Sequence, residues 1–161
     1  MRTKLRSKIT LLFMTCAVLL AIPAIALADT LTVSNSVSVD QNATKNPGDT
    51  GTANVWLDPT NGTPTGDTNG CNASTAAGQA VTVALSSNNT AVTFPNGNTA
   101  QITACGSANA KQITYKVASN ASAGSATISA NATGGKSGQT NNYLTTDTLT
   151  VTINAPADSA A

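Results

Sequence analysis

Few side chains of this sequence could do chemistry, and histidine is absent. The sequence has seven acidic residues, all of them aspartate, and three cysteines. Histidine is the usual base in serine, cysteine and many metal-assisted mechanisms, so those mechanisms lack their proton acceptor. The aspartates are scattered over expected strand ends, loops and termini, at Asp29, Asp40, Asp49, Asp58, Asp67, Asp147 and Asp158. We therefore predict that the protein is not an enzyme.

Cys71 and Cys105 are the two cysteines outside the N-terminal apolar run, in which Cys16 lies. In an exported protein such a pair predicts a disulfide. The bridge would close the stretch from residue 71 to residue 105, for which the chain-entropy model gives about 4 kcal/mol. The alternative is two free or intermolecular thiols. Two cysteines without histidine or glutamate do not form the common zinc sites.

The stretch from Asp58 to Gln79 is long and lacks apolar alternation, which is unusual inside a compact domain. It is rich in hard oxygen ligands of the kind that Ca²⁺ requires, at Asp58, Asn61, Asp67 and Asn69. Asp and Asn also stabilise turns without any metal, and we favour this interpretation. We expect no cofactor, with calcium at these residues as the alternative.

Trp56 is the one tryptophan. If Ala53, Val55 and Leu57 face the core, strand alternation places Trp56 on the opposite face. There it could stack on a sugar or a partner chain. The interpretation that we favour is that it packs beneath the long loop.

The first 28 residues have the pattern of a secretory signal peptide. Four basic residues precede an apolar run from Ile9 to Leu27, and Ala26-Leu27-Ala28 forms a small-residue cleavage site. A retained membrane anchor is the alternative, because the run is nearly long enough to span a bilayer. We predict cleavage before Asp29 and a protein that is secreted or lies on the cell surface.

Cleavage makes the remaining chain acidic. Four of the eight basic residues lie in the first 28 and all seven aspartates lie beyond them, so the mature charge is 4 − 7 = −3. Four scattered lysines do not neutralise a row of phosphates, which excludes nucleic acid as a partner. Contact with a membrane is expected only through the signal peptide.

Apolar residues alternate with polar ones along most of the remaining chain. This period of two predicts strands with one buried face around 31–33, 37–39, 53–57, 81–85, 92–94, 101–104, 113–117, 126–130 and 149–153. Turn-forming residues separate them, as in Asn46-Pro47-Gly48-Asp49. The fold class is therefore all-β, an immunoglobulin-like antiparallel β-sandwich of about seven to nine short strands over residues 29–153.

The region from about Ala80 to Ile153 resembles the bacterial immunoglobulin-like domains of invasin- and intimin-like surface proteins. The resemblance lies in the segments 83–92, 123–130 and 148–153, which would be a middle strand with its turn, the Gly-led penultimate strand and the last strand. It implies a spacer or adhesive module without a catalytic site. The antibody pattern is absent, because Trp56 precedes both cysteines.

We predict a non-catalytic structural or adhesive module, a monomer or part of a longer chain, that contacts a surface protein or a glycan. The alternatives are a carbohydrate-binding domain that uses Trp56 and a subunit of a strand-exchanged fibre, in which the strand 31–39 would add to a neighbour. Residues 154–161 have the Pro, Ala, Ser and Asp composition of a linker-like tail.

Overall fold

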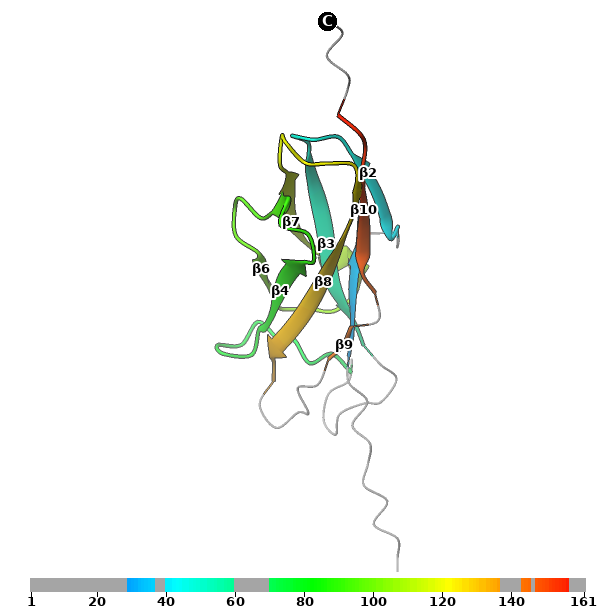
Figure 1. Cartoon of the computed structure of the whole chain (residues 1–161). Coiled ribbons are helices and arrows are strands. Elements are labelled where there is room, and N and C mark those ends of the chain that lie inside the picture. The colour runs from blue at the N-terminus through cyan, green and yellow to red at the C-terminus, as the bar shows by residue number, and fades with distance from the viewer. Residues whose placement is uncertain (1–28, 37–39, 60–69, 137–142, 146, 157–161) are drawn as a thin grey trace, which may run out of the picture.

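The computed structural model describes residues 29–36, 40–59, 70–136, 143–145 and 147–156 of the 161-residue chain. These residues form two β-sheets packed face to face (Figure 1). The first sheet has the order β5-β7-β3-β1-β9 and the second has the order β2-β10-β8-β4-β6. The expected β-sandwich is confirmed.

The strands of the first sheet are β1 (Thr30–Ser34), β3 (Thr50–Asp58), β5 (Val92–Thr93), β7 (Lys111–Val117) and β9 (Leu144–Thr145). Those of the second are β2 (Asn42–Lys45), β4 (Val81–Ser87), β6 (Thr99–Ile102), β8 (Gly124–Gly134) and β10 (Leu149–Ile153). A single turn of 3₁₀ helix, η1 (Ser107–Asn109), precedes β7.

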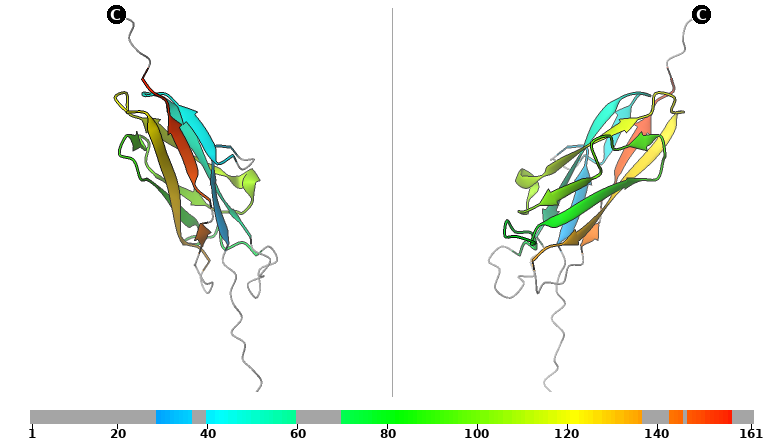
Figure 2. Two further views of the ribbon diagram at one scale, coloured as in Figure 1. Left: turned by 45° about the vertical axis from the view of Figure 1, so that its right-hand side comes forward. Right: turned by 90° about the vertical axis from the view of Figure 1, so that its left-hand side faces the viewer.

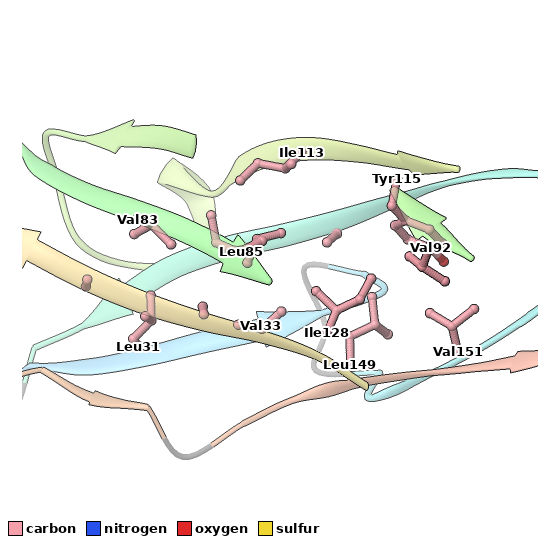
Figure 3. Close-up of a cluster of buried hydrophobic side chains, with 14 of the residues drawn as sticks. Leu31, Val33, Val83, Leu85, Val92, Ile113, Tyr115, Ile128, Leu149 and Val151 are labelled. Atoms are coloured by element: carbon pink, nitrogen blue, oxygen red, sulfur yellow. The ribbon is translucent and has the colours of Figure 1, made fainter. Parts of the chain in front are cut away.

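The core lies between the two sheets and is formed by the apolar side of each period-two strand. Val83 and Leu85 of β4 face Ile113 and Tyr115 of β7 across it (Figure 3). Leu31 and Val33 of β1, Ile128 of β8 and Leu149 and Val151 of β10 complete its centre. Branched aliphatic side chains fill such a narrow space in well-defined rotamers.

Two details of the predicted sandwich are wrong. The described residues contain ten strands instead of seven to nine, because β2 and β9 were not expected. Both lie at sheet edges, where a strand needs no apolar alternation, and only Ala43 of β2 is buried. The sheets are also not purely antiparallel, since β1 pairs with β9 and β10 pairs with β2 in parallel. The expected strand 37–39 lies outside the described residues.

The described domain begins at one end of the sandwich and leaves it at the other (Figures 1 and 2). β1 starts beside the last residue of β3, whereas β10 runs toward the opposite end. There Asn154 N donates to Lys45 O at 2.9 Å, next to the turn formed by Asn46, Pro47, Gly48 and Asp49. Gly48 has φ +90°, which explains why glycine occupies this turn.

Candidate functional site

Cys71 and Cys105 form a disulfide, as predicted. Their Sγ atoms lie 2.05 Å apart and their Cα atoms 5.8 Å apart. Cys71 is buried and Cys105 is half-buried. The bridge ties the segment that precedes β4 to the loop that follows β6.

Backbone hydrogen bonds hold the Cys105 side of the bridge against the first sheet. Gly106 N donates to Leu57 O at 2.7 Å, which continues the edge of β3 beyond its pairing with β7. The side-chain amide of Asn109, in η1, donates to Cys105 O at 2.7 Å. The loop after β6 of the second sheet therefore places Cys105 next to the end of β3 in the first sheet.

The Cys71 side is held by the neighbouring residue Asn72, which is also buried. Asn72 N donates to Asp29 Oδ2 at 2.8 Å, and Asn72 O accepts from Lys136 N at 2.8 Å. The first contact connects the segment to the residue before β1, and the second connects it to the residues that follow β8. Three distant parts of the sequence thus meet at this end of the sandwich.

Asp29 is a buried carboxylate, and no sequence pattern singles it out. Its Oδ2 atom lies 3.6 Å from Cys105 Sγ. Tyr143 is close by, and its hydroxyl donates to Gly134 O at 2.6 Å. Burial and the negative charge of Asp29 together raise the pKa of Tyr143 to about 12, while a hydrogen bond with Asn72 acts in the opposite direction. No local motif indicates this arrangement, because it depends on contacts across more than 40 residues of sequence.

The ligand atoms of Asp29, Cys71 and Cys105 lie within 4.8 Å of one another. A carboxylate and two thiolates could bind a soft metal, but these two sulfurs are joined in the disulfide. In this state the cluster offers no thiolate, so its chemistry is that of a disulfide beside a carboxylate.

An open recess lies next to the bridge. Both cysteines line it, together with Ala73, Thr103, Asn109 and Lys136. Asp29 is not among the described residues that line this recess. The bridge thus borders an open recess, whereas the Asp29 carboxylate is buried.

Only 2% of the Trp56 side chain is exposed, which fits the favoured expectation of a packed residue and not the alternative of a ligand contact. Trp56 Nε1 donates to Asp58 Oδ2 at 2.9 Å, and Thr32 Oγ1 donates to the same oxygen at 3.0 Å. Thr32 lies opposite Trp56 in the β1–β3 pairing, so both point to the outer face of the first sheet. Both side chains are nevertheless buried. Strand alternation predicts which face of the sheet a residue lies on, but not whether that face is covered. Residues 60–69 of the long loop lie outside the described residues.

The calcium candidates are described only in part. Asp58 uses its Oδ2 atom as the shared acceptor for Trp56 and Thr32. Asn61, Asp67 and Asn69 lie outside the described residues. Calcium at this loop thus stays an alternative without structural support. Within the part of the chain that is described, no helix is long and apolar enough to cross a membrane.

No family model matches the chain, and no curated protein matches it. A solved structure with some similarity is that of SSP-19, an MSP-domain protein like family member in Caenorhabditis elegans. The two sequences are 12% identical, the TM-score is 0.40, and the match covers 73% of this chain and 95% of the other.

Proposed function

We propose that this protein is an exported, non-catalytic structural or adhesive immunoglobulin-like module of a secreted or cell-surface protein. The observation that carries the proposal is the path of the chain. It enters the sandwich at β1 and leaves after β10 at the opposite end (Figure 1). A domain with this path adds its full length to a chain that runs through it, which is what a spacer requires.

The hydrogen bonds of the two terminal strands suit such a role. β1 pairs with β3 over five residue pairs, and β10 pairs with β8 over five and with β2 over four. Hydrogen bonds of an antiparallel ladder run perpendicular to the strands, and those of a parallel ladder are slanted. Tension along the long axis therefore loads each ladder in shear, so that its bonds must break together.

Two further observations support export and a surface role. The basic, apolar and small-residue pattern of residues 1–28 is typical of a signal peptide, and the bridge between Cys71 and Cys105 suits an oxidising compartment. The resemblance of residues 80–153 to bacterial immunoglobulin-like surface domains points the same way. The partner in our proposal is a surface protein or a glycan, and the module works without a cofactor or nucleic acid.

The alternatives receive less support. The buried position of Trp56 removes the feature that favoured a carbohydrate site. In a strand-exchanged fibre β1 would pair with a neighbouring chain, yet here Leu31 and Val33 of β1 are fully buried in their own sandwich. We therefore propose a module that acts as a monomer or as part of a longer chain.

Single-molecule force measurements test the spacer role. The exported protein is pulled through handles at its two ends, and through a control pair at residue 47 and the C-terminus. Asn154 Nδ2 donates to Asn46 Oδ1, so the control handles lie at the same end and peel β10 from its sheet. We expect one cooperative unfolding event at a much higher force for the end-to-end pair. Equal forces for the two pairs would contradict a load-bearing role.

Reduction of the disulfide supplies an internal check on the same records. While the bridge is intact, the chain between Cys71 and Cys105, a sequence separation of 34 residues, cannot be stretched. This segment corresponds to about 120 Å at roughly 3.6 Å per residue. Reduced molecules should lengthen by that additional amount on unfolding. If the length gain does not change, the recorded event is not the unfolding of this domain.

A further inference from the structure

The Cys71–Cys105 bridge is exposed on one side and faces a negative charge on the other. Both cysteines line the open recess, in which Lys136 also lies. Asp29 Oδ2 approaches Cys105 Sγ to 3.6 Å without lining that recess. The hydrogen bond from Asn72 N, at 2.8 Å, fixes the position of this carboxylate.

Reduction by a thiol passes through negative charge on the sulfurs. A thiolate attacks one sulfur of the bridge and forms a new S–S bond with it, while the other cysteine leaves as a thiolate with the electron pair of the broken bond. Attack on Cys71 places the leaving charge on Cys105, beside Asp29. Attack on Cys105 brings the incoming charge to the same place. Either route is opposed by the carboxylate, because like charges repel strongly where solvent is partly excluded.

We propose that Asp29 protects the solvent-accessible Cys71–Cys105 bridge against exchange with thiols. This role goes beyond that of a spacer and does not depend on it. Asp29 acts through the repulsion between its own charge and the negative charge that develops on the sulfurs during exchange.

The other charged or titratable groups near the bridge have distinct effects. Lys136 lines the recess and attracts anionic reagents toward it, so its effect opposes that of Asp29. Tyr143 stays neutral in the working pH range, because its pKa is raised to about 12. Asp29 Oδ2 is the charged atom that contacts Cys105 Sγ, at 3.6 Å. The predicted cleavage before Asp29 adds an α-ammonium group to the same residue, and this group loses its proton near about pH 8.

The test compares thiol reagents of different charge on Asp29→Asn and wild type. The exported protein is treated at about pH 9, where an α-amino group at Asp29 is mostly neutral, with 2-mercaptoethanesulfonate, 2-mercaptoethanol or cysteamine at equal thiolate concentration. Free thiols are counted over time by mass spectrometry. Asn retains an oxygen that accepts from Asn72 N. We expect the variant to react about tenfold faster with the anionic thiol and to change much less with the cationic one. Lys136→Gln should shift the same ratio in the opposite direction.

Asp49→Asn is the matched control, since it removes one negative charge at the other end of the sandwich. It should leave all three rates unchanged. Every reagent attacks as a thiolate, so some acceleration is expected with all three. If the acceleration is equal and the urea midpoint of Asp29→Asn is also lower, the residue acts only by holding the structure together, and the proposal is wrong. An unchanged rate with every reagent overturns it as well.

A measurement on wild type alone keeps the proposal testable if the Asp29 variant does not fold. In denaturant Asp29 and Cys105 are separated by 76 residues of flexible chain. The ratio of the anionic to the cationic rate should then rise about tenfold over that of the folded protein. An equal ratio of the two rates in the folded and unfolded protein would show that the fold does not slow the anionic thiol, and the proposal would be wrong.

Discussion

The ring of Tyr115 in β7 packs directly over the Cα atom of Gly51 in β3. The two residues are opposite each other in the β3–β7 register, and both are buried. A Cβ atom at residue 51 would lie 2.7 Å from Tyr115 Cε2 and still closer to Cζ and Oη. Glycine is therefore required here for space, since its φ lies outside the left-handed region.

Gly51→Ala should destabilise the protein by about 2 to 3 kcal/mol, the usual effect of an added group in a packed core. Chemical denaturation followed by far-UV circular dichroism measures this. In a Tyr115→Val background the same Gly51→Ala change should have little effect, because the ring that it strikes is gone. An equal loss in both backgrounds would show that the contact with Tyr115 is not the cause.

Tyr115→Phe should raise the free energy of unfolding by up to about 1 kcal/mol. The Tyr115 hydroxyl is buried and has no hydrogen-bond partner among the described residues, so its removal relieves a desolvated polar group. The ring and its packing over Gly51 are retained. The urea midpoint reports the change, and a clear fall in that midpoint would mean that the hydroxyl has a partner.

Stability should decrease between about pH 10 and 12 as tyrosines ionise. The pKa of Tyr143 is raised to about 12 in the folded protein, and burial also raises the pKa of Tyr115. Unfolded tyrosine loses its proton near pH 10. Above about pH 10 the unfolded state releases these protons more readily than the folded state. The free energy of unfolding therefore falls progressively as the pH rises through the folded-state pKa values. Tyr143→Phe should make the decrease in urea midpoint shallower than in wild type, and identical slopes would contradict the assignment.

The double substitution Cys71→Ala and Cys105→Ala should lower stability by about 4 kcal/mol, or less if the unfolded chain is already compact. Urea unfolding of this variant, with wild type under reducing and oxidising conditions, tests the estimate. Reduced wild type should resemble the double variant. Intact mass of the exported wild type should show no free thiol, and two free thiols would contradict the bridge.

Asp58→Ala should cost about 1 to 2 kcal/mol because it leaves the Trp56 and Thr32 donors without their shared acceptor. Asp58→Asn keeps an acceptor oxygen and should lose less. Trp56 is the one tryptophan, so its fluorescence reports on this site directly. We expect blue-shifted emission with little iodide quenching in wild type, and strong quenching would show that Trp56 is exposed after all.

The alternation of apolar residues was enough to predict most of the strands. Around 81–85, 113–117 and 149–153 the expected buried side chains are buried in the structure. This works because each of these strands has one buried face, and a period of two then fixes which residues point inward. The same reasoning missed the edge strand β2, where hydrogen bonding to β10 forms the strand without an apolar pattern.

The sequence by itself determined the β-sandwich and the pairing of Cys71 with Cys105, because alternation and the count of cysteines are local or compositional signals. Only the tertiary structure decided the burial of Trp56, the packing of Tyr115 on Gly51 and the position of Asp29 beside the bridge. Each of these depends on which segments meet across a sheet or at one end of the sandwich. Such contacts join residues far apart in the chain, and side-chain type at one position does not specify what covers it.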